Sequence, residues 1–229
     1  MSKLTKKQKI IQEKLDPEKT YSVDEAIDII QSVKSEKFDE TIDISVKLGV
    51  DSNKSDQNVR GAVTLPNSLG KDVAVAVFAD GDDASKAESA GAEFVGMDDL
   101  AEKFQKEEIN VDVVISTNAA MKVVGKLGQV LGPKGLMPNP KTGTVSDDVV
   151  SAIKNVKAGQ VRFRTDKNGI IHGCIGKVSF DADKIQSNAT ALLAELKKLK
   201  PASSKGVFIG NIALSSTMGP GVKLSLIHI

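Results

Sequence analysis

Two hydrophobic patterns divide the chain into parts of different construction. From Thr41 to Leu48 apolar and polar residues alternate, which is typical of a strand with one buried and one exposed face. From Val73 to Ala79 (VAVAVFA) the apolar run is unbroken, which favours a strand buried on both faces of a parallel sheet. The patterns therefore predict an antiparallel or mixed sheet in one part of the chain and a parallel sheet in another.

The middle of the chain, residues 68–159, predicts strands that alternate with helices. A helix that begins near Ala84 follows the first strand, and further elements continue the alternation. These are strands at Glu93–Gly96 and Val111–Ser116, and helices at Asp98–Glu107, Asn118–Val124 and Asp147–Val156, the last capped by Ser146. Such alternation is typical of a small Rossmann-like layered domain.

The flanking parts predict a different mixture of elements. Besides the alternating strand, they are a helix Val23–Ser35 capped by Ser22, a strand Val59–Leu65, a hairpin of Val161–Thr165 and Gly169–Val178, a helix Asp183–Leu199 and a closing strand Gly206–Leu214. The hairpin is expected to turn at Asn168-Gly169, a pair that favours tight turns. The pattern alone does not show that the first and last of these segments share a domain.

Composition limits the class of protein. The 229 residues are 40% hydrophobic and 27% charged, which is ordinary for a globular protein. The one cysteine, Cys174, rules out an internal disulfide framework and fits a reducing cytosol. No apolar run approaches the roughly 20 residues of a membrane helix, and the lysine-rich amino end lacks the apolar core of a signal peptide. We therefore expect a cytoplasmic protein with no membrane partner.

Charge and aromatic content narrow the choice of partner. Residues 68–159 carry 10 Lys and Arg against 14 Asp and Glu, whereas the two flanking parts together carry 21 against 16. A basic surplus fits phosphate contact, although a solvated lysine-rich surface would have the same composition. Aromatic residues make up only 3% of the chain, and its arginines are Arg60, Arg162 and Arg164. Stacking on single strands therefore cannot dominate, and an RNA partner would be structured and read through its shallow minor groove.

Glycine, proline and lysine recur in the stretch Gly125 to Val145, GKLGQVLGPKGLMPNPKTGTV. Apolar residues interleave with them, so the stretch predicts a rigid, packed loop with lysines at its surface. It is not a Walker A loop, because Lys134 is followed by glycine rather than by Ser or Thr, and no G-x-G-x-x-G occurs. A nucleotide-binding enzyme or sensor built on the middle of the chain stays as an alternative.

Two short segments of the flanking parts suit contact with a nucleotide. Phe38 is either an exposed ring or a core residue that closes under the preceding helix. The segment Ser216 to Gly219 is either an RNA-docking turn, with two hydroxyls and a thioether, or merely a tight turn. His172 and Cys174 share a strand face but are too few for a zinc site, and no nucleophile has a recognisable base. We expect no metal, no cofactor and no enzymatic activity.

Four sequence blocks resemble one protein family. They are Lys37–Thr41 (KFDET), Ser55–Gly61 (SDQNVRG), the stretch Gly125–Val145 and Ser216–Pro220 (STMGP). In order and spacing they are similar to the family of the first-numbered protein of the large ribosomal subunit, in its bacterial form. The resemblance implies an α/β fold of two domains. An outer α/β sandwich would be built from both chain ends, residues 1–67 and 160–229, with a Rossmann-like three-layer domain, residues 68–159, inserted in it.

The resemblance also implies a function and its residues. Members of this family bind the stalk region of large-subunit rRNA, assist the movement and release of deacylated tRNA at the exit site, and often repress translation by binding their own operon mRNA. The residues that match the family's rRNA site are Lys37, Phe38, Thr41, Ser216, Thr217, Met218 and Gly219, with Arg164, Lys167 and His172 as an extension of the surface. The central loop would offer Lys126, Lys134, Gly135 and Lys141 to tRNA or rRNA. The free protein is expected to be a monomer.

Two features stay outside this interpretation. The lysine-bearing helix Leu193–Lys200 would suit a protein-interaction module, which is a third hypothesis for the function. The end of the chain, Leu224 to Ile229, is apolar where the family pattern finishes in short polar or basic residues. We assign that end no function.

Overall fold

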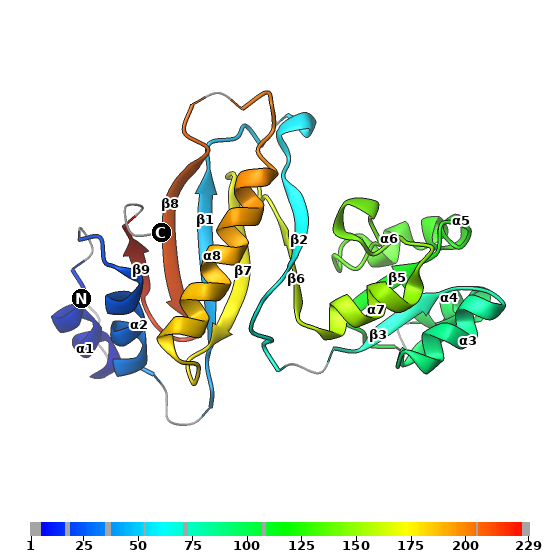
Figure 1. The fold of residues 1–229 in the computed structure, drawn as a ribbon, viewed down its shortest axis with the longest axis horizontal. Helices are drawn as coiled ribbons and strands as arrows, with labels where there is room; N and C mark the ends of the chain where they lie inside the picture. Colours follow the sequence, from blue (N-terminus) through cyan, green and yellow to red (C-terminus); the bar gives the residue numbers. More distant parts are fainter. Residues whose placement is uncertain are drawn as a thin grey trace. The chain divides into compact units, whose positions relative to one another are not determined.

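The structure, a computed structural model, describes residues 6–16, 19–34, 38–52, 54–70, 73–106, 109–204 and 206–225. It is a mixed α/β protein, which confirms the predicted fold class, and it divides into two compact units (Figure 1). Unit 1 consists of Met1–Leu69 together with Val161–Ile229, and unit 2 is Gly70–Gln160.

The main sheet of unit 1 has four antiparallel strands in the order β7-β1-β8-β9. Their bounds are Thr41–Leu48 for β1, Ile170–Lys177 for β7, Ile209–Ser216 for β8 and Gly221–Leu224 for β9. The alternation predicted for β1 is confirmed, because Ile42, Ile44, Val46 and Leu48 are buried while the residues between them are half-buried or exposed. In this register Thr41 lies opposite Lys177, and Ile42 lies opposite Ser216.

Two helices pack on the apolar face of this sheet. They are α2 (Val23–Ser32) and α8 (Ala182–Lys198), and their buried side chains share one core with those of β1, β7 and β8. The predicted cap of α2 is confirmed, since Ser22 Oγ accepts from the Glu25 amide at 3.2 Å and the Glu25 carboxylate accepts from the Ser22 amide at 3.1 Å. A third helix, α1 (Lys6–Lys14), precedes them in the chain.

A second, two-stranded sheet pairs β2 (Arg60–Thr64) with β6 (Gln160–Arg164), next to a short 3-10 helix η1 (Ser55–Gln57). The predicted hairpin between β6 and β7 is therefore only partly correct. The chain does turn at Asp166–Gly169, but beyond a single bridge from Thr165 to Ile171 the two strands join different sheets. The reason lies in Thr165, whose backbone amide and hydroxyl both donate to the Val59 carbonyl and hold the end of β6 beside the β2 segment.

The end of the chain corrects one interpretation of the sequence. Leu224 closes β9 and is buried in the unit 1 core, so it is a structural residue rather than part of a tail without a role. Tyr21 bonds to the residues on both sides of Leu224. The Tyr21 amide donates to the Lys223 carbonyl at 3.0 Å, and the Tyr21 carbonyl accepts from the Ser225 amide at 2.9 Å. Residues 226–229 lie outside the described part of the chain.

Unit 2 is built around three short parallel strands in the order β4-β3-β5, as alternating strands and helices require. The strands are β3 (Val75–Phe78), β4 (Phe94–Gly96) and β5 (Val113–Ser116). Helices α3 (Asp82–Ser89) and α7 (Val149–Lys157) pack on one face, and α4 (Asp98–Gln105), α5 (Met121–Lys126) and α6 (Gly128–Leu131) pack on the other. The result is a three-layer unit with a core on each side of the sheet.

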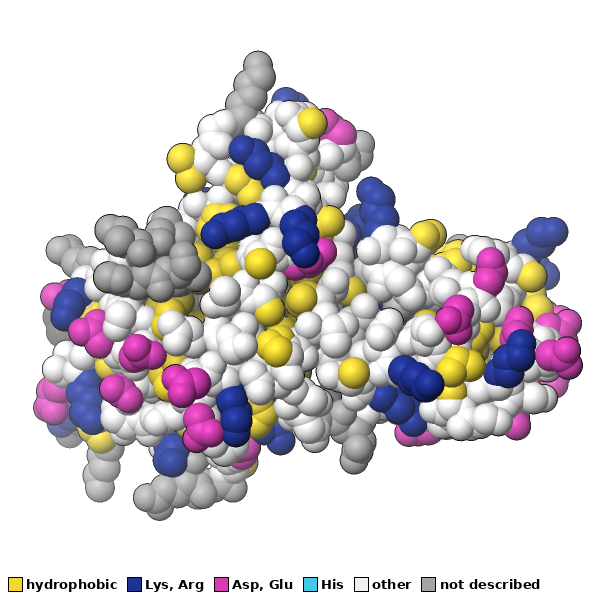
Figure 2. Space-filling model, in the orientation of Figure 1, with side chains coloured by type: hydrophobic (Ala, Val, Ile, Leu, Met, Phe, Trp, Pro, Cys, Tyr) yellow, Lys and Arg dark blue, Asp and Glu magenta, His cyan; other side chains and the backbone are white. Residues whose placement is uncertain are grey.

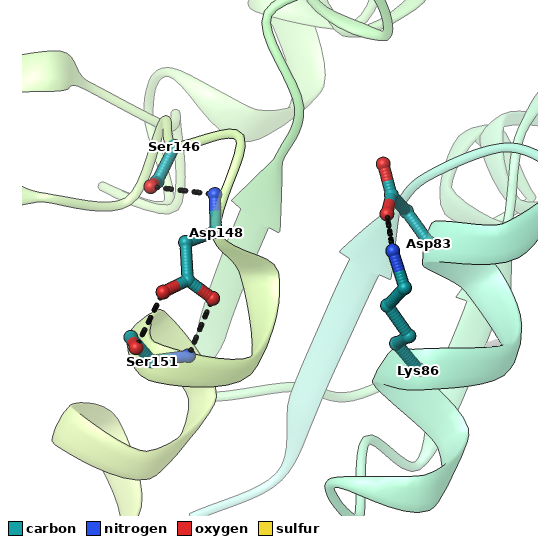
Figure 3. Close-up of polar contacts among 5 residues, drawn as sticks. All are labelled: Asp83, Lys86, Ser146, Asp148 and Ser151. Atoms are coloured by element: carbon teal, nitrogen blue, oxygen red, sulfur yellow. Dashed lines mark hydrogen bonds and ion pairs between the residues drawn. The ribbon is translucent and has the colours of Figure 1, made fainter.

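The start of α7 differs from the sequence prediction. Its cap is Asp148, whose carboxylate accepts from the Ser151 amide at 3.2 Å and from the Ser151 hydroxyl at 2.6 Å (Figure 3). Ser146, the predicted cap, instead accepts from the Asp148 amide at 3.1 Å. The helix thus begins two residues later than predicted, because the residue with a carboxylate reaches the free amides of the first turn.

Candidate nucleic-acid interface

Three segments of unit 1 meet at the end of the sheet where β1 begins and β7 and β8 end. They are residues 38–41, 178–180 and 216–219, which we call the sheet-end site. The Val178 amide donates to the Glu40 carbonyl at 2.9 Å, and the Asp39 carboxylate accepts from the Ser179 amide at 3.1 Å and from its hydroxyl at 2.8 Å. These bonds join residues 38–41 to residues 178–180. The bond between Thr41 and Thr217 joins two of the four matched blocks, which are far apart in the sequence.

Within this site Thr41 and Thr217 are bonded to each other. The Thr41 amide donates to Thr217 Oγ1 at 3.1 Å, and the Thr217 amide donates to the Thr41 carbonyl at 3.1 Å. Thr217 is exposed and Thr41 half-buried, so this pair stands at the surface of the sheet end.

The site also carries two of the four exposed large hydrophobic side chains among the described residues. Phe38 is 49% exposed and Met218 is 62% exposed. Neither belongs to the hydrophobic core, so the alternative in which Phe38 closes the core under the preceding helix is not what the structure shows. An apolar ring and a thioether held in water beside hydroxyls are typical of a contact surface.

Ser216 lies differently from its expected place at the surface. It is buried, and its hydroxyl donates to Glu40 Oε2 at 2.6 Å. The turn also depends on Gly219, because a Cβ atom at that position would stand 2.3 Å from Ser216 Oγ. Ser216 and Gly219 thus shape the turn from within, while Thr217 and Met218 face outward.

The remaining predicted residues of unit 1 are spread along the sheet. Lys37 lies outside the described residues. His172 is exposed near the middle of β7, opposite Ser45 of β1. Arg164 is exposed at the end of β6, one residue before the bridge from Thr165 to Ile171, and Lys167 is exposed in the turn before β7. Six residue steps separate the first residue of β7 from the level of Thr41, about 20 Å at roughly 3.3 Å per residue. The structure brings Phe38, Thr41, Thr217 and Met218 together but not Arg164 or Lys167 with them.

Acidic groups of unit 1 limit where its surface can contact phosphates. Burial raises the pKa of the Asp43 carboxyl above its ordinary value, and the neighbouring His172 partly opposes that rise. Backbone hydrogen bonds from Ile170 and Asn168 lower the pKa of Asp166, whose carboxylate stands 3.7 Å from His172 Nε2. Figure 2 shows acidic side chains gathered over α2, so this part of unit 1 is an unfavourable place for phosphates.

The Gly/Pro stretch of unit 2 packs as the sequence predicts. Leu127 and Leu131 are buried in one of the two cores. Asn139 holds the far side of the stretch, where its side chain accepts from the Lys141 amide at 2.9 Å and its amide donates to Thr144 Oγ1 at 2.8 Å. The exposed residues of this stretch include the four predicted for contact, Lys126, Lys134, Gly135 and Lys141. From Val113 to Ser146 the sequence contains no Asp or Glu, so this segment of an acidic unit is basic.

Acidic side chains occupy the edge of unit 2 where a parallel sheet would bind a nucleotide. Phosphates bind at the carboxyl ends of parallel strands, next to helix amino termini. Here those positions hold carboxylates, among them Asp80 after β3, Asp82 and Asp83 in the first turn of α3, and Asp147 and Asp148 before α7. Asn118, which follows β5, donates to both carboxylate oxygens of Asp147 at 2.9 Å. This edge disfavours a nucleotide ligand.

Two further hypotheses can be compared with the described residues. The predicted helix Leu193–Lys200 is the end of α8, which stops at Lys198. Its Leu193 and Leu196 are buried in the unit 1 core, which leaves mainly its charged side for any protein partner. In the described ranges no cluster of three or more His, Cys, Asp or Glu residues is suited to a metal ion. Likewise no described helix has the length and apolarity needed to cross a membrane.

The chain is a two-unit α/β protein with hydroxyl- and lysine-bearing surfaces, a combination that suits the class of RNA-binding proteins. The particular family follows from comparison with known sequences. The model of the ribosomal protein L1p/L10e family matches residues 30–220, and the chain belongs to that family. The resemblance inferred from four blocks is therefore confirmed over most of the chain.

Two relatives have similar length and sequence. The large ribosomal subunit protein uL1 of Saccharophagus degradans is 59% identical over 224 residues, which cover 98% of this chain and 97% of the relative. The large ribosomal subunit protein uL1 of Cellvibrio japonicus is 58% identical over 222 residues, which cover 97% of this chain and 96% of the relative. Both are named as ribosomal proteins rather than as enzymes.

Proposed function

We propose that the chain is a structural component of the large ribosomal subunit whose unit 1 binds the stalk region of the rRNA. The observation that supports this most is the sheet-end site, where Phe38 and Met218 are exposed beside the Thr41–Thr217 pair. Exposed apolar side chains that gather in one place are typical of an interaction surface, and hydroxyls suit the 2′-hydroxyls and phosphates of a minor groove.

The contact is proposed to be one of shape rather than of base reading. The described residues of the sheet-end site include no arginine. Arginine is the side chain that most often recognises a base edge through two parallel hydrogen bonds. The site presents hydroxyl and backbone groups, the exposed Phe38 ring, the Met218 thioether and the Asp39 carboxylate, which is bonded to Ser179. These groups complement a structured RNA that is already folded. His172 would meet the RNA only if it extends about 13 Å along the sheet from Thr41, and Lys167 only if it extends about 20 Å. Arg164, next to the bridge from Thr165 to Ile171, would also need an RNA that runs along the sheet.

Unit 2 is proposed to make a second contact with RNA. Its segment Val113–Ser146, which has no Asp or Glu and carries Lys126, Lys134 and Lys141, would contact deacylated tRNA or rRNA as the stalk moves, so that tRNA can leave the exit site. The same RNA surface of unit 1 would bind a similar structure in the protein's own operon mRNA and repress its translation. These roles accord with the family resemblance and with the distribution of charge.

The experiment is a binding titration against a stalk-region fragment of large-subunit rRNA, beside an unrelated hairpin, at two salt concentrations. The proposal expects tight binding to the stalk fragment alone, and the salt dependence would report how many phosphates are neutralised. Equal and weak binding to both RNAs would contradict it.

The role of unit 2 needs a separate measurement. Replacing Lys126, Lys134 and Lys141 with alanine should weaken binding of deacylated tRNA to reconstituted subunits while stalk affinity stays unchanged. Replacing Lys86, Lys103 and Lys106, which lie on α3 and at the end of α4, is the charge-matched control. Saturable binding of a nucleotide to the full chain would instead favour the enzyme or sensor hypothesis.

A further inference from the structure

Glu40 is a fully buried carboxylate in the middle of the sheet-end site. Its exposure is 0%, although Phe38 and Asp39 immediately before it are exposed. Glutamate is almost never buried to this extent unless its carboxylate is bonded, because the loss of water around the charge is costly. The position of Glu40 therefore calls for a specific role of its side chain.

The carboxylate bonds to the turn that follows β8. Its Oε2 atom accepts from the Ser216 hydroxyl at 2.6 Å and from the Met218 amide at 3.3 Å. The first is as short as charge-assisted hydrogen bonds are. The residue between them, Thr217, is bonded to Thr41, which directly follows Glu40. Two neighbouring residues, Glu40 just before β1 and Thr41 at its start, thus hold three successive residues of the turn.

This arrangement acts on the orientation of the exposed side chains. A turn of four residues at the end of a strand has few backbone bonds of its own, and here the Gly219 amide bonds back to the Ser216 carbonyl at 3.1 Å. The bond from Glu40 to the Met218 amide fixes the backbone from which the Met218 side chain projects into water. Without it the turn would sample other conformations, and binding would have to order it again.

We propose that Glu40 is the positioning residue of the RNA site. It does not touch RNA itself, because it is buried, and it holds the turn through Ser216 and Met218 in the conformation that RNA meets. The RNA half of this inference rests on the proposed function, whereas the hold on the turn can be measured without RNA. The Glu40 carboxylate therefore faces donors of the turn and not the phosphates of the RNA.

The test compares three variants of the full chain. Glu40→Gln keeps the shape but exchanges a charge-assisted acceptor for a neutral one, and Ser216→Ala removes the same bond from the other side. Asn188→Ala is the matched control. Asn188 is also 0% exposed, and its amide group bonds to the Ile175 carbonyl at 2.7 Å and to the Asn67 carbonyl at 3.1 Å, so its loss destabilises unit 1 without touching the turn.

Two readouts distinguish positioning from stability alone. Hydrogen exchange of the Met218 amide should become about tenfold faster in Glu40→Gln and Ser216→Ala, whereas the Leu214 amide within β8 keeps its rate. Stalk RNA affinity should fall about tenfold in both variants and by less than about twofold in Asn188→Ala. In a background of Thr217→Val with Met218→Ala, Glu40→Gln should cause no further loss, because the side chains that it positions are gone.

Several results would overturn the inference. An unchanged Met218 exchange rate in both variants would show that Glu40 does not hold the turn. If the Met218 amide exchanges faster while RNA affinity stays unchanged, the bond from Glu40 to the turn does not serve RNA binding. The same conclusion follows if Glu40→Gln lowers RNA affinity as much in the Thr217→Val, Met218→Ala background as in the unsubstituted protein. If the unsubstituted protein fails to prefer the stalk RNA, the proposed function fails, while the exchange rates still decide whether Glu40 orders the turn.

Discussion

Thr41 and Thr217 stand 176 positions apart in the sequence, yet the hydroxyl of one accepts from the amide of the other at 3.1 Å. The Thr217 amide completes the pair by donating to the Thr41 carbonyl. This relationship ties the start of β1 to the turn after β8. It makes the two residues a single surface feature, because a change in either one alters the position of the other.

Replacing Thr217 with valine tests this feature. The side chain keeps its shape but loses the hydroxyl, so the Thr41 amide has no acceptor there once RNA excludes water. We expect stalk RNA affinity to fall by about 1–3 kcal/mol in a titration. Thr190→Val is the control, because its hydroxyl bonds to the Gln186 carbonyl on the exposed side of α8. Unchanged binding by a folded Thr217→Val protein would remove this residue from the interface.

Replacing Phe38 with alanine tests the exposed ring. Since Phe38 lies outside the core, the free energy of unfolding should change by less than about 0.5 kcal/mol. RNA affinity should fall by about 1–3 kcal/mol, the range measured when an aromatic contact to a base is removed. Val207→Ala is the control, because Val207 is 78% exposed and lies just before β8, at the opposite end of that strand from the sheet-end site. Equal affinities of the two variants would argue against a contact at Phe38.

Local periodicity explains how much of the fold could be predicted. The strand Thr41–Leu48 has the predicted bounds, because alternation over eight residues is a strong and local signal. The strand Gly221–Leu224 was missed, because it is four residues long and its pairing with β8 and with Tyr21 depends on distant partners. The same holds for β6, which joins β2 rather than its neighbour in the sequence.

The candidate site was predicted in its residues but not in its geometry. The matched blocks contain Phe38, Thr41 and Thr217, which the structure places together. The sequence could not show that Ser216 faces inward or that Glu40 is buried, since both depend on a contact across 176 positions. The separation of Lys167 from Thr41 follows from the register of β1 and β7, which no local pattern determines.

A substitution at Gly219 tests the shape of the turn. A Cβ atom at this position would stand 2.3 Å from Ser216 Oγ, so Gly219→Ala must displace the serine that bonds to Glu40. We expect a loss of about 1–3 kcal/mol in the free energy of unfolding, measured by denaturant titration. Gly221→Ala is the matched control, because nothing lies within 4 Å of its Cβ position. Equal stability of the two variants would show that the turn adjusts without cost.

The cap of α7 predicts a dependence on pH. Hydrogen bonds from the Ser151 hydroxyl and amide lower the pKa of Asp148 below its ordinary value of 3.8. A carboxyl with a lowered pKa in the folded state stabilises the fold above its unfolded pKa, and this contribution disappears as pH falls through the folded value. Asp148→Ala should therefore be less stable than the unsubstituted protein at neutral pH, and the difference should shrink below about pH 4. Thermal unfolding across that range is the measurement, with Ser146→Ala as the control, since Ser146 bonds only the amide of Asp148 in this cap (Figure 3). A stability difference that stays the same at every pH would show that the charge of Asp148 contributes nothing to the cap. A larger loss of stability in Ser146→Ala than in Asp148→Ala would show that Ser146, the residue predicted from the sequence, is the more important cap.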